Sequence, residues 1–147
     1  MAKLRHIAIT VKDPWKTAEF YMAVFGMKKV GETDWANARG VYLSDGVINL
    51  ALLSYKTEEA AGEDRGRDYV GLHHFGFWVD DVAATGKAIE AAGGRYWMGE
   101  VAAGAGFYEV KFRDPDGVVV DITANGWVGA AKDVVAAVKE AEQAEPV

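Results

Sequence analysis

Two stretches of the chain resemble each other, and this repeat is the strongest constraint on the fold. Residues 5–13 read RHIAITVKD and residues 73–81 read HHFGFWVDD, so that His6 aligns with His74 at an offset of 68 residues. Self-similarity at a fixed spacing indicates repeated structural units. We therefore predict two similar modules joined by a polar link. Their expected bounds are residues 1–60 and residues 68–127.

Each half of the repeat predicts the same order of secondary structure. Residues 4–11 alternate and are rich in β-branched side chains, which is typical of a strand. Asp13 followed by Pro14 is typical of a helix N-terminus, and Asp81 takes the same place in the second half. The order β-α-β-β-β in each module predicts an α+β fold. The expected helices are 14–25 and 82–92, and the later strands are 28–30, 39–43, 47–53, 96–98, 107–112 and 118–123.

The two modules together are predicted to form one domain, residues 1–127, of ordinary size. A tail follows, residues 128–147, in which valines and alanines from Val128 to Val138 recur at helical spacing. This spacing predicts a helix with one apolar stripe. The stripe must pack on the domain or on a second subunit, and together with open sheet edges it favours a homodimer.

The composition excludes several classes of protein. The chain of 147 residues contains no cysteine, which excludes disulfides, thiolate metal ligands and thiol nucleophiles. A formal net charge of −6 argues against nucleic acid as the partner. No apolar run approaches the roughly 20 residues of a membrane helix, and no secretory signal is evident. We expect a cytoplasmic protein that binds a small molecule, without a nucleic-acid or membrane partner.

Four polar residues occupy equivalent places on the repeated strands. Because successive side chains of a strand point to opposite faces, the strongly apolar positions separate from the polar ones. The apolar face should meet the helices, which leaves the polar positions on the other face. If the two halves curve around a shared hollow, the polar side chains converge in it. They are His6, Asn49, His74 and Asp121.

This set of side chains predicts a metal site. A buried carboxylate without a partner is strongly disfavoured. Two imidazoles and one carboxylate commonly hold a divalent ion while leaving positions open for substrate. We predict that His6, His74 and Asp121 are metal ligands, with Asn49 as a possible fourth ligand.

Three other interpretations stay open at this point. Asp121 could form an ion pair with Arg39 or Lys111 in place of binding a metal. Asn49 could hydrogen-bond to the backbone or to water. His73 has the opposite strand parity to its neighbour, and we expect it to be structural or exposed at the rim.

Over residues 3–126 the chain resembles the vicinal oxygen chelate superfamily. The resemblance rests on residues 6–13 and 72–81, and most specifically on the Asp-Pro-Asp-Gly hairpin at 114–117 with an acid four residues beyond its glycine. It implies paired β-α-β-β-β modules that form a cupped mixed sheet around one divalent metal. The ligand positions that it implies are His6, Asn49, His74 and Asp121.

Two of these positions depart from the pattern of the family. The last ligand is usually glutamate, and Asp121 is one methylene shorter. The second position is usually glutamate or glutamine in the glyoxalase and epimerase branches, where it can serve as a base. Asn49 cannot accept a proton in that way.

The resemblance implies a metal-dependent enzyme that acts on a small oxygenated substrate. The many aromatic residues of the chain are consistent with an aromatic substrate. The enzyme would be a lyase or isomerase, or an extradiol-type dioxygenase, and its metal (Fe, Mn, Ni, Co or Zn) would chelate vicinal oxygens of the substrate. Tyr108 would act as a general acid or orient the substrate, or would serve in packing alone. Glu109 and Glu100 are candidate bases by type alone. The expected substrate contacts are Trp78, Trp35, Tyr42 and Trp97.

Two functions of other classes remain as alternatives. One is a metal-free protein that sequesters an aromatic drug or natural product, as bleomycin-resistance proteins of this fold do. The other is a regulatory or structural dimer in which the tail helix forms the working surface.

Overall fold

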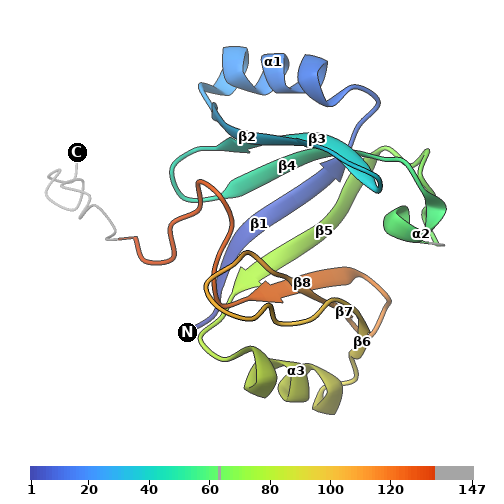
Figure 1. Ribbon diagram of the computed structural model, residues 1–147, viewed down its shortest axis with the longest axis vertical. Helices are drawn as coiled ribbons and strands as arrows, with labels where there is room; N and C mark the ends of the chain where they lie inside the picture. The colour runs from blue at the N-terminus through green and yellow to red at the C-terminus, as the bar shows by residue number, and fades with distance from the viewer. Residues whose placement is uncertain (63, 135–147) are drawn as a thin grey trace, which may run out of the picture.

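The computed structural model describes residues 1–62 and 64–134, which form one curved sheet covered by two helices (Figure 1). The eight described strands lie in the order β2-β3-β4-β1-β5-β8-β7-β6. The elements are β1 (Lys3–Thr10), α1 (Pro14–Phe25), β2 (Lys28–Asp34), β3 (Ala38–Ser44), β4 (Asn49–Tyr55), α2 (Glu58–Ala61), β5 (Gly71–Trp78), α3 (Val82–Ala91), β6 (Arg95–Met98), β7 (Val110–Arg113) and β8 (Val119–Thr123).

The two predicted modules meet where β1 and β5 pair antiparallel in the middle of the sheet. On either side the next neighbour is parallel, β4 beside β1 and β8 beside β5, so the sheet is mixed. Each half carries its own helix, α1 over the first and α3 over the second (Figure 1). The predicted α+β fold with paired β-α-β-β-β modules in a cupped sheet is confirmed.

Both long helices begin where their capping residues predict. The Asp13 side chain accepts hydrogen bonds from the backbone amides of Trp15 and Lys16, and Pro14 occupies the first turn. Asp81 accepts from the amide of Ala84 in the same way at the start of α3. Neither helix, at 12 and 10 residues, has the length that a bilayer-spanning segment needs, and the same holds for every helix in the described part of the chain.

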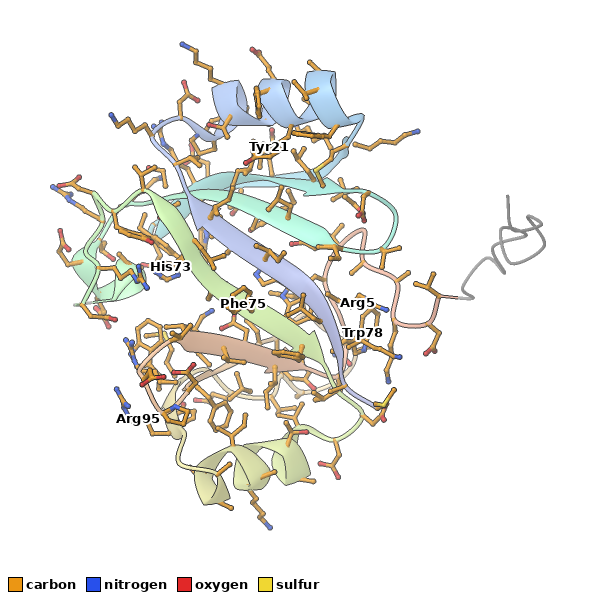
Figure 2. The ribbon with its side chains drawn as sticks, turned by 180° about the vertical axis from the view of Figure 1, so that it is seen from behind. Arg5, Tyr21, His73, Phe75, Trp78 and Arg95 are labelled. Atoms are coloured by element: carbon orange, nitrogen blue, oxygen red, sulfur yellow. The ribbon has the colours of Figure 1, made fainter. Side chains whose placement is uncertain are left out.

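Two apolar clusters join the helices to the outer face of the sheet. The first lies beneath α1, where Tyr21 sits between the helix and the strands (Figure 2). The second lies beneath α3. The buried members are Ala18, Val41, Leu43 and Leu52 in the first cluster, and Val79, Tyr108, Val110, Phe112 and Ile122 in the second. The opposite, concave face of the sheet is therefore free to carry polar groups.

The structure differs from the sequence expectation in three local features. The second strand extends to Asp34, because its pairing with β3 stabilises polar residues that show no strand pattern of their own. The strand predicted over 107–112 begins only at Val110. The link between the modules contains the short helix α2, which was not predicted.

The predicted tail helix is not present over residues 128–134, which follow an irregular path. Tertiary hydrogen bonds override the helical spacing there. The amide of Ala131 donates to the carbonyl of Val47, and the Arg5 side chain donates to the carbonyls of Ala131 and Lys132. The rest of the predicted helix, residues 135–147, lies outside the described residues.

Candidate metal centre

The concave face carries a row of five residues that the strand registers place side by side. The paired residues run across five neighbouring strands, in the spatial order β4, β1, β5, β8 and β7. The middle residue is a glycine, and the Trp127 indole occupies the space that a side chain would take there. The members of this central row are Asn49, His6, Gly76, Asp121 and Lys111.

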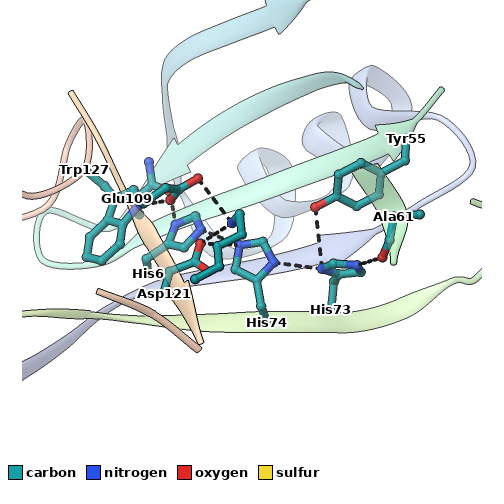
Figure 3. A network of polar contacts seen from close by, with 10 residues as sticks. His6, Tyr55, Ala61, His73, His74, Glu109, Asp121 and Trp127 are labelled. Atoms are coloured by element: carbon teal, nitrogen blue, oxygen red, sulfur yellow. Dashed lines mark hydrogen bonds and ion pairs between the residues drawn. The ribbon is translucent and has the colours of Figure 1, made fainter. Parts of the chain in front are cut away.

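His74 stands two residues before Gly76 on β5 and joins the central row from the side. Its Nε2 lies 3.1 Å from His6 Nε2 and 3.2 Å from Asp121 Oδ2 (Figure 3). One ligand atom from each of the three residues lies within 4.8 Å of the other two, and all three side chains are buried. The structure therefore brings together the three residues that the sequence nominated as ligands.

The proton on His6 is fixed by a neighbouring backbone carbonyl. Asn49 Nδ2 donates to the carbonyl of Val128 at 2.8 Å, so Asn49 Oδ1 faces His6 Nδ1, also at 2.8 Å. Because Oδ1 can only accept, the proton of the imidazole lies on Nδ1. Burial lowers the pKa of His6 to about 3, which keeps the ring neutral at pH 7. Its Nε2 therefore presents a lone pair to His74.

A second backbone carbonyl fixes the proton on His74 through His73. His73 Nε2 donates to the carbonyl of Ala61, and its Nδ1 lies 2.8 Å from His74 Nδ1 (Figure 3). Burial lowers the pKa of His73 to about 4, so this ring is neutral and its Nδ1 accepts. The proton between the two rings then belongs to His74 Nδ1. When His74 is neutral, its Nε2 carries the lone pair; when Nε2 is also protonated, it donates to Asp121 Oδ2 at 3.2 Å.

Of the two expectations for His73, a structural role agrees with its hydrogen bonds, whereas exposure at the rim is wrong because β5 contains a bulge. Ala8 of β1 pairs with His74, whereas the next residue of β1, Ile9, pairs with Leu72, so His73 is the additional residue. A bulge breaks the alternation of faces and re-aims the side chain beside it. His73 is consequently buried and reaches His74.

The three side chains fit a divalent cation. His6 Nε2 and His74 Nε2 lie 3.1 Å apart, and nitrogens bound to one ion at about 2.1 Å also stand roughly 3 Å apart. Asp121 Oδ1 is buried and has no hydrogen-bond partner among the described residues. Two imidazole nitrogens and a carboxylate, with a buried oxygen unsatisfied, form a donor set for transition metals.

Lys111 provides a positive charge next to this donor set. Its Nζ lies 2.6 Å from Asp121 Oδ2 and 3.4 Å from Glu109 Oε1. His74 and Lys111 together hold the pKa of Asp121 far below its usual range. The ion pair of Asp121 with Lys111, one of the open alternatives, is therefore present. Arg39, the other candidate, instead lies over the ring of Trp15.

Trp127 and Glu109 complete the site; Trp127 was not assigned to it from the sequence, and Glu109 was named only as a candidate base by residue type. The indole of Trp127 stacks on His6, and its Nε1 donates to Glu109 Oε2 at 2.9 Å (Figure 3). Burial raises the pKa of Glu109, although Lys111 opposes this. A signal existed for Glu109: since Val110 and Phe112 are apolar and face α3, residues 109 and 111 point to the concave face.

A cavity of about 280 Å³ lies over the donor set. Two of the four predicted substrate contacts, Trp35 and Tyr42, line it. Aromatic and aliphatic side chains make up most of its wall, and polar groups are concentrated at its floor. The other lining residues are His6, Thr33, Asn37, Ala38, Leu53, Tyr55, Ala60, His74, Met98, Phe107, Glu109, Lys111 and Trp127.

Three residues that were predicted for the pocket lie elsewhere. The indole of Trp78 donates to the carbonyl of Ala124, outside the cavity wall. Trp97 packs under the guanidinium of Arg113, on the second module's edge strand. Tyr108 is buried in the cluster beneath α3, because it shares a face with Val110, and its hydroxyl accepts from the amide of Ala124. Tyr108 is thus a packing residue.

Comparison with known proteins supports the same fold and identifies a family. The family model described as the Glyoxalase/Bleomycin resistance protein/Dioxygenase superfamily matches residues 3–122. A methylmalonyl-CoA epimerase structure in complex with methylmalonyl-CoA and NH4+ superposes with a TM-score of 0.70 at 23% identity, over 89% of this chain and 99% of that one. At 23% identity, the similarity to the epimerase structure concerns the fold alone.

Two curated relatives resemble the chain in sequence at just over a quarter identity. A probable chloroplastic lactoylglutathione lyase of Arabidopsis thaliana is 27% identical over 84% of this chain, but the chain spans only 36% of that protein's length. The lactoylglutathione lyase of Haemophilus influenzae is 26% identical over 84% of this chain and 93% of its own.

Proposed function

This chain belongs to the Glyoxalase/Bleomycin resistance protein/Dioxygenase superfamily, and on that premise we propose that it is a metal-dependent lyase or isomerase. Its substrate would be a small carbonyl compound with a second oxygen next to the carbonyl, and the reaction would move a proton on the adjoining carbon. The names of the relatives, a lyase and an epimerase, support this class of reaction.

The observation that carries the proposal is the convergence of one ligand atom each from His6, His74 and Asp121, which lie within 4.8 Å of one another and are all buried. In this proposal His6, His74 and Asp121 hold one divalent ion, which supplies positive charge for two substrate oxygens. Asn49 and His73 keep the two imidazoles in the tautomer that binds a metal. The aromatic wall of the cavity holds the rest of the substrate and limits access of water.

The arrangement favours a lyase or isomerase over a ring-cleaving dioxygenase. The dioxygenases of this family use additional histidines for acid–base chemistry. The chain has three histidines, two of which are the proposed ligands. The third, His73, is bonded at Nε2 to Ala61 and at Nδ1 to His74, so that no imidazole is left for a proton of the substrate.

Elemental analysis tests the metal. Protein purified without chelator should contain about one divalent ion per chain, and His74→Ala and Asp121→Ala should lose it. Glu100→Gln is the matched control, because Glu100 is an exposed carboxylate outside the cavity wall. Retention of the ion in both ligand variants would place it at another site and contradict the proposal.

Activity is tested by exchange of the α-proton of S-lactoylglutathione and of methylmalonyl-CoA in D2O, followed by proton NMR. Exchange of either probe that depends on the metal supports a lyase or isomerase. Nickel, cobalt, zinc or manganese in the purified protein would agree with it.

One observation supports a second candidate function, a metal-free sequestering protein. The Lys111 ammonium already neutralises Asp121 at 2.6 Å, and the cavity wall is rich in aromatic rings. In that case the purified protein holds no ion and gains none on addition of metal. It would bind a flat aromatic ligand with an affinity that falls in Trp35→Ala.

A further inference from the structure

We propose that Glu109 is the proton acceptor of the active site, the carboxylate that takes and returns the α-proton of the substrate. This inference rests on the proposed function of the centre formed by His6, His74 and Asp121. Glu109 directly precedes β7, and the proposal gives it a chemical task that Asn49 cannot perform. An amide has no basic lone pair for a proton, whereas a carboxylate has.

Among the cavity-lining residues, the other titratable groups are unsuited to this task. The free nitrogens of His6 and His74 face each other at 3.1 Å, and their other nitrogens are occupied. Burial raises the pKa of Tyr42 and Tyr55, so both hydroxyls stay protonated. Lys111 is an ammonium between two carboxylates and has no lone pair.

Among the described residues, Glu109 is the one carboxylate that lines this cavity, and its side chain is accessible from the cavity. Its side chain is 24% exposed, whereas Asp121 is fully buried beneath it. Trp127 Nε1 binds Oε2 at 2.9 Å, and Lys111 Nζ lies 3.4 Å from Oε1. Each oxygen keeps a further lone pair, because a carboxylate offers about four acceptor positions.

The residues that hold Glu109 also hold it close to the donor set. The indole that binds Oε2 is stacked on His6, with ring centroids 4.8 Å apart. The ammonium beside Oε1 is the one that binds Asp121. Glu109 therefore borders the space above both His6 and Asp121 (Figure 3), where a substrate held by the centre would present its carbon.

The groups around Glu109 act on its pKa in opposite directions. Burial raises the pKa of Glu109, which makes its carboxylate a stronger proton acceptor than an exposed one. The Lys111 ammonium and the Trp127 indole act in the opposite direction and favour the ionised form. The net shift of the Glu109 pKa is upward.

The step is balanced without another reactant. The C–H bond next to the carbonyl breaks, its proton moves to a Glu109 oxygen, and the electron pair shifts onto the carbonyl oxygen to give an enolate. Return of the proton to the same carbon, or to the neighbouring one, restores the carboxylate. The substrates that allow this are α-hydroxycarbonyl compounds and thioesters with an acidic α-hydrogen.

The test compares Glu109→Gln with Glu100→Gln in the metal-loaded protein. The probes are S-lactoylglutathione and methylmalonyl-CoA, with exchange of the α-proton in D2O measured by NMR. Glutamine keeps an oxygen that can accept from Trp127 Nε1, so the fold should persist, and thermal unfolding checks this. We expect the exchange rate to fall about 10²–10⁴-fold in Glu109→Gln, with metal content and probe affinity unchanged. Glu100→Gln should retain the wild-type rate.

Chemical rescue separates a proton-transfer role from a structural one. Added formate should restore part of the exchange in Glu109→Ala, since a free carboxylate can enter the space left by the side chain, and chloride at equal ionic strength should not. A wild-type rate in Glu109→Gln with metal bound would overturn the assignment of Glu109 and leave the proposed function standing. Absence of exchange by the metal-loaded wild-type protein with both probes would overturn the two together.

Discussion

The indole ring of Trp127 lies flat on the imidazole of His6, with ring centroids 4.8 Å apart and ring planes 6° from parallel. This stack has room because the residue beside His6 in the central row is Gly76. A Cβ atom at that position would lie 2.6 Å from Cζ2 of Trp127 and 2.9 Å from Cβ of His6. Gly76 thus makes possible the contact that fixes one face of a proposed ligand.

Gly76→Ala should therefore destabilise the protein and displace the stacked indole. Overpacking of a well-packed interior costs about 1–3 kcal/mol in the free energy of unfolding. Urea unfolding of the variant measures this loss. Metal affinity should fall as well, because His6 loses the ring that orients it.

Gly106→Ala is the matched control for this substitution. No heavy atom lies within 4 Å of a Cβ built at Gly106, and its φ is not positive. Its unfolding free energy should stay within about 0.5 kcal/mol of the wild type. Equal stability of the two variants would show that Trp127 and His6 move apart at little cost.

Asn49→Ala should weaken metal binding more than it weakens the fold. The substitution leaves His6 Nδ1 and the carbonyl of Val128 without their partner, at a cost of about 1–3 kcal/mol in stability. Loss of a group that orients a ligand histidine typically lowers metal affinity about 10–100-fold. Titration with a chromophoric chelator measures that change. Asn125→Ala, at an exposed amide, should change neither quantity appreciably.

The unfolding free energy should decrease as the pH falls from about 6.5 towards 4. The folded-state pKa is lowered to about 3 for His6 and about 4 for His73, below the unfolded value of 6.5. Between these limits the unfolded chain binds more protons than the folded one, so acid favours unfolding. Each histidine contributes a slope of about 1.4 kcal/mol per pH unit, and Glu109, whose pKa is raised, offsets part of it.

Urea unfolding at several pH values in the presence of EDTA checks this dependence. His73→Gln serves as the comparison, because an amide can still donate to the carbonyl of Ala61 and accept from His74. In this variant the unfolding free energy should depend less steeply on pH, by the contribution of one histidine. An unchanged slope would mean that His73 is protonated in the folded protein.

Lys111→Met should have opposite effects on the metal-free and metal-loaded protein. Without metal, Asp121 becomes a buried carboxylate that has lost its closest cation, so the unfolding free energy should fall by about 3 kcal/mol or more. With metal, the repulsion between an ammonium and a divalent ion disappears, and the affinity for the ion should rise. Calorimetry and chelator titration measure the two effects. A lower affinity would show that Lys111 orients Asp121 for the metal.

The repeat allowed the architecture and three members of the centre to be predicted. Strand alternation places His6, His74 and Asp121 on the face away from the helices, and duplication implies that the two halves face each other. The capping residues Asp13 and Asp81 marked the helix starts correctly. These signals are local or repeated, and for that reason a single sequence contains them.

The remaining parts of the site depend on features that alternation does not reveal. Lys111 reaches Asp121 because the register between β7 and β8 pairs the two residues, and register is a tertiary property. His73 turns inward because of a bulge. Trp127 enters the site from beyond the last strand. The face of Tyr108 was assigned wrongly, although its apolar neighbours Val110 and Phe112 indicate the helix side.

The proposed ligands are divided between the repeated halves, since His6 belongs to the first and both His74 and Asp121 belong to the second. A bound ion would then act as a non-covalent cross-link over the β1–β5 seam. Neither half could chelate it alone, so the free energy of chelation would be available only to a docked pair. Were the chain cleaved within the polar link, the two fragments would reassociate more tightly in the presence of the ion than with EDTA.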